Sequence, residues 1–277
     1  MLMNALCTIT TKDYMAQTLA LRDSCFEHGN SIAFCILVID SDETITPDKA
    51  GTYFFKLSDM TSEPLARHII KKYRRNRDTL RWCLKPVFLK HLLVQEKYNK
   101  VIYADNDIYF FADFSFLFAE INPGGLLLCP HWRCTSPLVD KNWFIVNFTD
   151  GFYNAGFVGS GSGAGDALDW WMQACLFHCA KTYRKGLFDD QKYLDFIPVI
   201  FDKTTIIKHR GCNVAYWNKI ENKREQIHET VKINGIWDIV FIHFTRDLIK
   251  SIMNNEDALL APFLNEYTTA CALYKNA

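Results

Sequence analysis

Residues 101–111 read Val-Ile-Tyr-Ala-Asp-Asn-Asp-Ile-Tyr-Phe-Phe, an apolar run that meets two carboxylates one residue apart. Residues 101–104 have the β-branched and aromatic content of a buried strand. Because side chains alternate along an extended backbone, Asp105 and Asp107 would point the same way. Carboxylate oxygens suit Mg²⁺ or Mn²⁺, and open α/β sheets bind ligands at the carboxyl ends of their strands. The stretch predicts a metal site at the edge of an α/β sheet, although Asp-Asn-Asp could also be a simple polar turn.

Composition limits the class of protein. The chain has 277 residues, of which 49% are hydrophobic and 14% aromatic, which is enough for a substantial core and argues against disorder. The 31 basic residues balance the 31 acidic residues, so no overall field draws the protein to nucleic acid. We expect no nucleic-acid partner, and any anion site must be local.

The chain has the features of a cytoplasmic protein. Its first residues lack a cationic region followed by an apolar core, and no apolar run reaches about 18 residues, so we expect neither a signal peptide nor a transmembrane segment. The ten cysteines lie largely in apolar runs, as buried thiols in a reducing cytosol do. Peripheral contact with the inner face of a membrane stays open.

Two clusters bring cysteine near histidine: Cys129, Cys134 and His131, and Cys175, Cys179 and His178. We expect residues 167–180 to be helical, which would place Cys175 and Cys179 one turn apart. A tetrahedral zinc site would need further ligands from elsewhere. Packing is therefore the favoured interpretation of both clusters.

A β-α-β unit is predicted at the start of the chain. Its strands are expected at residues 6–10 and 32–39, with a helix at 14–27 between them. A right-handed crossover makes the strands parallel and brings their ends to one sheet edge. The residues of interest near these ends are Thr8, Tyr14 and Asp40. An aromatic face and a carboxylate suit a nucleotide base or ribose, while helix capping or packing would explain the same residues.

Further motifs follow in order along the chain. Lys85 lies in a predicted helix at residues 79–96, where it could neutralise a phosphate or be a surface lysine. Residues 151–159 contain Asn154-Ala155-Gly156, whose small residues allow close approach of a ligand to the backbone.

Two motifs lie in the last third of the chain. Asp190-Gln191 belongs to the stretch 186–194, where an Asp could equally cap a helix. His243 stands near the end of the apolar stretch 239–244, where a lone histidine is usually a packed core residue.

In this order the motifs resemble those of nucleotide-sugar glycosyltransferases of the GT-A fold, in particular the retaining family-8-type enzymes of bacteria. The resemblance covers roughly residues 5–250. It implies one Rossmann-like α/β domain over residues 1–277, with a mixed central sheet flanked by helices. The nucleotide-binding half would span about residues 1–120, and the half for donor sugar and acceptor about residues 121–277.

The resemblance also implies roles for individual residues. Asp105, Asp107 and His243 would hold Mn²⁺ or Mg²⁺ on the diphosphate of a nucleoside-diphosphate sugar, with a UDP-sugar as the expected donor. Residues expected to contact the donor are Thr8, Tyr14, Asp40, Lys85, Asp105, Asn106 and Gly156. Residues expected beside the anomeric centre are Asn154, Asp190 and Gln191.

The chain departs from the family after His243. The family often has Gly-x-x-Lys-Pro-Trp closing over the diphosphate, whereas residues 244–250 read Phe-Thr-Arg-Asp-Leu-Ile-Lys. Arg246 or Lys250 would have to replace that cation.

Two stretches bear on the acceptor. Residues 209–218, His-Arg-Gly-Cys-Asn-Val-Ala-Tyr-Trp-Asn, resemble a recurrent stretch in bacterial sugar transferases, so we expect His209 to help bind an acceptor; the alternative is a loop with a buried Trp. The dense basic run at residues 67–77 is either a solvated face or a surface that attracts a phosphate-bearing acceptor or an anionic membrane.

The expected function is metal-dependent transfer of a hexosyl group to a glycan or lipid-linked glycan, with retention of configuration, in polysaccharide biosynthesis. Three alternatives remain. They are a nucleotidyltransferase acting on sugar phosphates, a metal-independent sugar-binding module, and an inactive nucleotide-sugar-binding relative.

Overall fold

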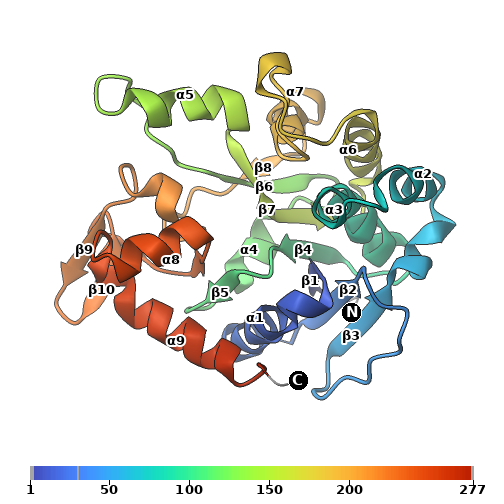
Figure 1. Cartoon of the computed structure of the whole chain (residues 1–277), viewed down its shortest axis with the longest axis horizontal. Coiled ribbons are helices and arrows are strands. Elements are labelled where there is room, and N and C mark those ends of the chain that lie inside the picture. The colour runs from blue at the N-terminus through green and yellow to red at the C-terminus, as the bar shows by residue number, and fades with distance from the viewer. Residues whose placement is uncertain (1–2, 30, 276–277) are drawn as a thin grey trace.

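A mixed seven-stranded sheet forms the centre of the protein (Figure 1). The computed structural model describes residues 3–29 and 31–275. The strands of this sheet are β1 (Ala5–Thr10), β2 (Ala33–Val38), β3 (Thr52–Lys56), β4 (Lys100–Ala104), β6 (Leu126–Pro130), β7 (Tyr153–Gly161) and β8 (Thr205–Ile206). They lie in the order β3-β2-β1-β4-β7-β6-β8. β1 pairs in parallel with β2 and β4, whereas β7 is antiparallel to β4 and β6.

Helices cover both faces of this sheet. One face packs against α2 (Pro64–Tyr73), α3 (Arg77–Val94) and α6 (Gly165–Phe177), and the other against α1 (Met15–His28) and α4 (Ser115–Glu120). Along β1, Cys7 and Ile9 enter the first core and Leu6 the second, because successive side chains point to opposite faces. The predicted single α/β domain with helices on both sides of a mixed sheet is confirmed.

The remaining elements surround the carboxyl end of β4. The short strands are β5 (Ile108–Phe110), β9 (Arg224–Ile227), β10 (Thr230–Ile233), β11 (Trp237–Asp238) and β12 (Phe241–His243). The remaining helices are α5 (Lys141–Asp150), α7 (Ile197–Ile200), α8 (Arg246–Met253) and α9 (Ala261–Ala272). Single 3₁₀ segments are η1 (Lys12–Tyr14), η2 (Leu57–Ser62), η3 (Tyr183–Lys185), η4 (Lys192–Phe196), η5 (Tyr216–Asn218) and η6 (Ala258–Leu260). β12 pairs antiparallel with β5, which brings the late part of the chain back to β4.

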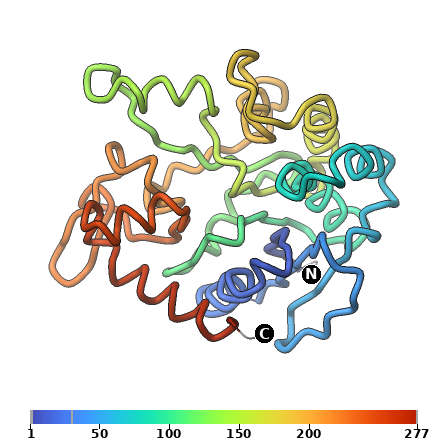
Figure 2. The backbone as a smooth tube through the Cα atoms, in the orientation of Figure 1, coloured from blue at the N-terminus to red at the C-terminus, as the bar shows by residue number. Residues whose placement is uncertain are grey.

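The C-terminal part of the described chain returns to α1 (Figure 2). α9 packs against α1, and Arg22, fully buried in α1, donates a hydrogen bond to the hydroxyl of Tyr274 at 3.1 Å. This return holds α8, which precedes α9, beside the end of β4. None of the helices in the described ranges is long and apolar enough to cross a bilayer.

Two local predictions are wrong. The helix expected at residues 167–180 ends at Phe177, so Cys179 lies beyond it. The backbone at Asp105–Asp107 turns between β4 and β5 instead of remaining extended. The β-α-β opening is confirmed, with its elements within about two residues of their expected bounds. Within residues 3–29 and 31–275, neither cysteine cluster forms a group of metal ligands, and every cysteine is a free thiol.

Candidate active site

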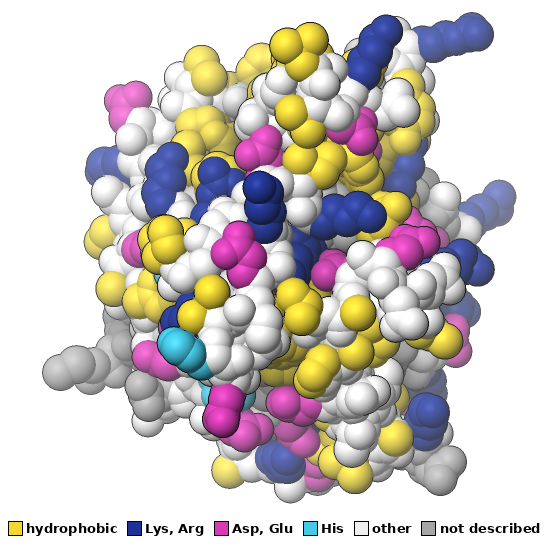
Figure 3. All heavy atoms as spheres, turned by 90° about the vertical axis from the view of Figure 1, so that its left-hand side faces the viewer, with side chains coloured by type: hydrophobic (Ala, Val, Ile, Leu, Met, Phe, Trp, Pro, Cys, Tyr) yellow, Lys and Arg dark blue, Asp and Glu magenta, His cyan; other side chains and the backbone are white. Residues whose placement is uncertain are grey.

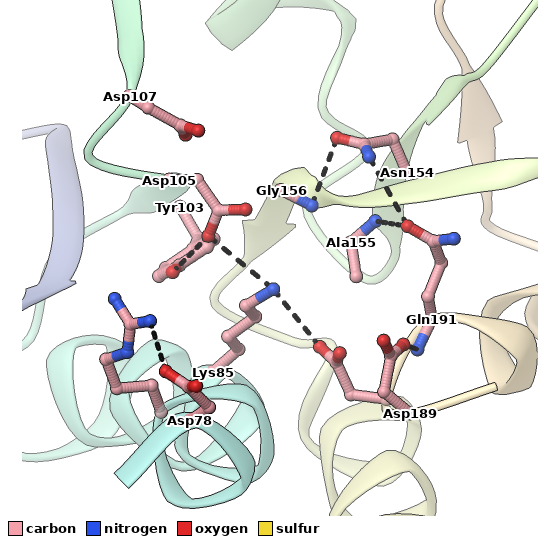
Figure 4. A network of polar contacts seen from close by, with 12 residues as sticks. Asp78, Lys85, Tyr103, Asp105, Asp107, Asn154, Ala155, Gly156, Asp189 and Gln191 are labelled. Atoms are coloured by element: carbon pink, nitrogen blue, oxygen red, sulfur yellow. Dashed lines mark hydrogen bonds and ion pairs between the residues drawn. The ribbon is translucent and has the colours of Figure 1, made fainter. Parts of the chain in front are cut away.

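Five separate segments meet at the carboxyl end of β4. The turn after β4 supplies Asp105 and Asp107, β12 supplies His243, and α3 supplies Lys85. β7 and the segment before η4 complete the site with Asn154, Gly156 and Gln191, as Figure 4 shows, and with Asp190. The backbone amide of Asp105 donates to the carbonyl of Gly156 at 2.8 Å, which locks the turn to β7.

Asp105, Asp107 and His243 form a compact group of ligand atoms. One atom from each residue lies within 4.8 Å of the others, and His243 Nε2 is 2.9 Å from Asp107 Oδ1. Burial lowers the pKa of His243, but the neighbouring Asp107 carboxylate has the larger opposite effect, so the net pKa of His243 is raised. Burial raises the pKa of Asp107, but its contact with His243 outweighs this, so the net pKa of Asp107 is lowered. Two carboxylates and an imidazole are a donor set that Mn²⁺ accepts.

Gly156 leaves the space that such an ion needs. A Cβ at this position would lie 2.6 Å from Asp105 Oδ2 and 2.7 Å from His243 Cε1, closer than non-bonded atoms approach. The absence of a side chain therefore keeps open the region between a carboxylate and the imidazole. The residues present fit a divalent cation at Asp105, Asp107 and His243.

The orientation of His243 is set by the segment 209–218. Its Nδ1 donates to Asn213 Oδ1 at 3.2 Å, which turns Nε2 toward Asp107. Trp217 packs edge-on against the His243 ring, with centroids 5.2 Å apart. Asn213 has a φ of 61°, a conformation that favours Asn or Gly. This segment thus supports the metal group, a role that the sequence did not reveal.

His209 is not among the residues that line the cleft described below, and its role in acceptor binding stays a prediction. Its ring packs between Phe116 and Trp237, at centroid distances of 5.3 and 4.6 Å, and Nδ1 accepts from the Gly211 amide at 3.2 Å. These contacts make His209 part of the aromatic packing at the start of the 209–218 segment. The alternative interpretation, a loop with a buried Trp, is met in part, because Trp217 is half-buried and packs against the rings of His131 and His243.

Lys85 connects the metal group with Asp190. Its ammonium lies 3.6 Å from Asp105 Oδ1 and 3.3 Å from Asp190 Oδ2, and its side chain is 4% exposed. Burial lowers the pKa of Lys85, but the two carboxylates outweigh it and the net pKa is raised. Burial raises the pKa of Asp190 well above its usual range, against the effect of Lys85. Tyr103 donates to the same oxygen, Asp105 Oδ1, at 2.7 Å and helps to fix that carboxylate.

Asn154 and Gln191 form a second network on the β7 side. Asn154 Oδ1 accepts from the Gly156 amide at 3.1 Å, and its Nδ2 donates to Gln191 Oε1 at 3.3 Å and to His131 Nε2 at 3.2 Å. Gln191 Nε2 donates to the Asp150 carbonyl at 2.8 Å. Burial lowers the pKa of His131 well below its usual value, so the ring is neutral and can accept from Asn154. Neither Asp190 nor Gln191 caps η4 with its side chain.

A cleft of about 510 Å³ opens at Asp105 and Asp107, whereas the other groups described above are not among the residues that line it: Lys85, Asn154, Gly156, Asp190, Gln191 and His243. It is lined by Ile9, Tyr14, Gln17, Arg81, Trp82, Tyr103, Asp105, Asn106, Asp107, Phe244, Arg246, Ile249, Lys250 and Tyr267. Arg246 and Lys250 are exposed and one turn apart on α8, and neither has a carboxylate partner in the part of the chain described. They are free to meet a phosphate opposite Asp105 and Asp107.

Two residues expected to contact the base or ribose, Thr8 and Asp40, do not line this cleft. Thr8 is fully buried on the face of β1 opposite Ile9, because alternate side chains point to opposite sides. Asp40 accepts from the Lys12 amide at 3.0 Å and pairs with Arg77 at 3.6 Å, outside the cleft lining. Tyr14 does line the cleft, with the Arg81 guanidinium 5.1 Å from its ring centroid.

Arg81 and Tyr103 are site residues that sequence reasoning missed. Each had a usable signal, because Arg81 is four residues before Lys85 on one helix face, and Tyr103 is two residues before Asp105. The basic run 67–77 lies outside the cleft lining. It occupies α2 and the following turn, where Lys72 donates to the α6 carbonyls of Leu176 and Phe177 at 2.6 and 3.0 Å.

Comparison with known sequences gives two relatives and no function. No protein-family profile matches the chain. The uncharacterised protein YfnF of Bacillus subtilis strain 168 is 28% identical over 258 residues, covering 90% of this chain and 83% of its own length. The uncharacterised protein YfnD of the same strain is 29% identical over 252 residues, which cover 86% of this chain and 76% of the length of YfnD.

Comparison with solved structures identifies the fold. The galactosyltransferase LgtC, in complex with donor and acceptor sugar analogues, has a TM-score of 0.57 at 14% identity and covers 99% of this chain and 97% of its own. Mouse xyloside xylosyltransferase 1 has a TM-score of 0.54 at 12% identity, and the match covers 88% of this chain and 99% of the mouse chain. The glycosyltransferase GlyE of Streptococcus pneumoniae TIGR4 has a TM-score of 0.50 at 15% identity and covers 90% and 56%. The chain has the GT-A fold; family 8 within it stays a prediction.

Proposed function

We propose that this protein is a metal-dependent glycosyltransferase that moves a hexosyl group from a nucleoside-diphosphate sugar to a glycan or lipid-linked glycan. One observation carries the proposal. Asp105, Asp107 and His243 converge at 4.8 Å or less in a cleft of a GT-A fold, and Lys85 links them to Asp190. Fold alone would not support an activity, because one fold hosts many functions. The arrangement of charged groups in this site supports a specific activity.

The donor would lie along the cleft from Tyr14 to Asp190. Tyr14 offers an aromatic face to a base, with uridine as the expected nucleoside. Arg246 and Lys250 would replace the family's closing lysine and pair with the diphosphate. The donor sugar would then rest against Gly156 and Asn154, where the backbone can be approached closely.

A divalent ion, Mn²⁺ or Mg²⁺, held by Asp105, Asp107 and His243 would offset charge on the departing diphosphate. The protein groups prepare the site for that charge. Tyr103 and Lys85 fix Asp105, and Asn213 fixes His243. Gln191 is held by Asp150 and supports Asn154, so the sugar would meet a rigid set of amides.

We propose retention through a front-face substitution. Asp190 is the carboxylate that the resemblance places beside the anomeric centre, but Lys85 lies 3.3 Å from one of its oxygens, which suits a supporting role better than that of a nucleophile. The bond between the anomeric carbon and the diphosphate oxygen breaks while the acceptor oxygen bonds to that carbon from the same face. The acceptor proton passes to the departing diphosphate.

The reaction class is tested by two parallel incubations. In one, the protein is given a panel of nucleotide sugars, and nucleoside diphosphate is measured. In the other, it is given nucleoside triphosphates with sugar phosphates, and pyrophosphate is measured. Diphosphate release in the first alone supports the transferase; pyrophosphate release in the second would identify a nucleotidyltransferase, and neither product together with donor binding would identify an inactive relative.

A further inference from the structure

Exposed apolar side chains gather on one edge of the molecule, which we call the apolar–basic edge and define as residues 138–152 and 177–200. More than half of the exposed large hydrophobic residues of the described chain lie here: Leu138, Val139, Ile145, Phe148, Phe152, Phe177, Tyr183, Phe196, Val199 and Ile200. Leu138 is 95% exposed and Val199 79%. Single exposed apolar residues are ordinary, but a group of this size marks an interaction surface.

The two segments are in contact with each other. The Phe152 amide donates to Asp195 Oδ1 at 2.8 Å, and Lys192 Nζ lies 5.9 Å from the centroid of the Phe152 ring. α5 and α7 lie along the same upper edge of the molecule in Figure 1. In Figure 3, hydrophobic, basic and some acidic side chains occur along the upper part of the surface. The contacts of Phe152 with Lys192 and Asp195 join the two segments of the edge.

The charge of this edge has one sign. Its exposed charged side chains are all basic: Lys141, Lys181, Arg184 and Lys185. Its acidic side chains are buried or half-buried, and two of them, Asp140 and Asp195, have polar partners. Asp140 caps α5 by accepting from the Trp143 amide at 2.9 Å, and Asp195 accepts from Phe152 and pairs with Lys192 at 2.8 Å. Arg184 and Lys185 have no carboxylate partner within residues 3–29 and 31–275.

We propose that the apolar–basic edge seats the protein on an anionic phospholipid surface. Protruding side chains such as Leu138 and Val199 would enter the boundary between headgroups and acyl chains, and the cations would meet lipid phosphates. A protein partner is the less fitting occupant, because the charged side chains that are exposed beside these apolar residues are all basic. The exposed cations of the edge complement an anionic membrane directly.

Membrane contact through the apolar–basic edge would bring the cleft close to an acceptor anchored in the same membrane. Asp190 and Gln191 continue directly into Lys192 of η4, and Gln191 donates to the carbonyl of Asp150 at the end of α5. The sugar side of the cleft therefore adjoins the edge, so an acceptor anchored in the membrane would be presented beside Asp190. This last step rests on the proposed function, whereas membrane binding itself does not.

The test is sedimentation with lipid vesicles, in the absence of any donor. Full-length protein is mixed with vesicles of phosphatidylcholine alone or of phosphatidylcholine with phosphatidylglycerol. We expect binding to the anionic vesicles, weaker binding at high salt, and little binding to neutral vesicles. Failure of the wild-type protein to sediment with anionic vesicles would overturn the proposal, whatever its activity on soluble donors.

Matched variants locate the surface. Arg184→Glu/Lys185→Glu should weaken vesicle binding at least about tenfold, whereas Lys97→Glu/Lys223→Glu, with the same change of charge elsewhere, should not. Leu138→Ser/Val199→Ser should also weaken binding, and Ile236→Ser/Met253→Ser, at exposed apolar residues outside the edge, should not.

Two results would contradict this assignment. One is equal vesicle binding by the edge variants and their controls. The other is a concentration-dependent dimer that Leu138→Ser/Val199→Ser abolishes, which would identify the edge as a protein interface. Turnover of a soluble nucleotide sugar by Arg184→Glu/Lys185→Glu should match the wild type, which separates this inference from the proposed activity.

Discussion

His243 Nδ1 donates to Asn213 Oδ1 at 3.2 Å, and this contact determines which nitrogen of His243 faces Asp107. A histidine ligand is commonly oriented by a partner on its other nitrogen. Asn213 lies thirty residues before His243 in the chain, in a stretch whose sequence alone predicts a sugar contact. The geometry instead makes it a residue that positions the metal group.

Asn213→Gly should lower Mn²⁺ affinity by about 10- to 100-fold, because it removes the acceptor that orients His243. Glycine tolerates the φ of 61°, so the backbone should be preserved. Asn213→Asp keeps an acceptor oxygen and should retain most of the affinity. Direct Mn²⁺ titration followed by electron paramagnetic resonance measures both, without any substrate. Equal affinity of the Gly variant and the wild type would contradict this role.

Gly156→Ala should abolish Mn²⁺ binding while leaving the fold intact. The added methyl group would lie 2.6 Å from Asp105 Oδ2 and 2.7 Å from Asn154 Oδ1 and from His243 Cε1, so these side chains must move apart. Gly165→Ala is the matched control, since a Cβ there meets nothing within 4 Å. Retained metal affinity in Gly156→Ala would show that the ligands do not enclose this space.

Lys85→Met should destabilise the protein by about 3–5 kcal/mol at neutral pH, because it leaves Asp105 and Asp190 without their buried counter-charge. Burial already raises the pKa of Asp190, and loss of Lys85 would raise it further. A carboxyl group with a raised pKa favours the folded state where it is protonated, so the deficit should shrink as the pH falls.

Denaturant unfolding at several pH values measures this effect. Lys90→Met, which removes a half-exposed lysine paired with Glu63 and Asp169, should cost no more than about 1 kcal/mol. A pH-independent deficit in Lys85→Met would contradict the assigned electrostatics.

His131 should make stability fall in mild acid. Its pKa is held well below the usual value of about 6.5, chiefly by burial, so the unfolded chain binds a proton there that the folded chain does not. Stability is therefore lost as the pH falls below about 6.5, by up to about 1.4 kcal/mol per pH unit. Denaturant unfolding of His131→Gln should show a shallower slope between about pH 6.5 and 5 than that of the wild type. An unchanged slope would mean that His131 is protonated in the folded protein.

Much of the fold and part of the site could be predicted from local pattern. Asp105 and Asp107 follow a strongly apolar strand, and strand ends meet at one sheet edge whatever their detailed register. Lys85 was predictable because its helix leads into that strand. The structure brings these residues together with His243, Asn154, Gly156, Asp190 and Gln191. The most distant pair in the sequence, Lys85 and His243, is 158 positions apart.

The rest depended on tertiary placement. Whether Thr8 or Ile9 faces the cleft depends on which side of β1 is covered by α1, and a strand buried on both faces carries no sign of that. His209 and Asn213 are both polar residues in one loop. The bridge between Val214 and Ile242 of β12 brings Asn213 to His243, while His209 packs against Phe116.

The central claim is that Asp105, Asp107 and His243 support turnover of a nucleotide sugar, and the most direct test uses one accepted donor. Nucleoside diphosphate release is measured with Mn²⁺ or with EDTA, for the wild type and for Asp105→Ala/Asp107→Ala, with folding of both checked by circular dichroism. The account predicts release by the wild type with Mn²⁺, and none with EDTA or in the double variant. Equal release in EDTA, or by the folded double variant, would contradict it.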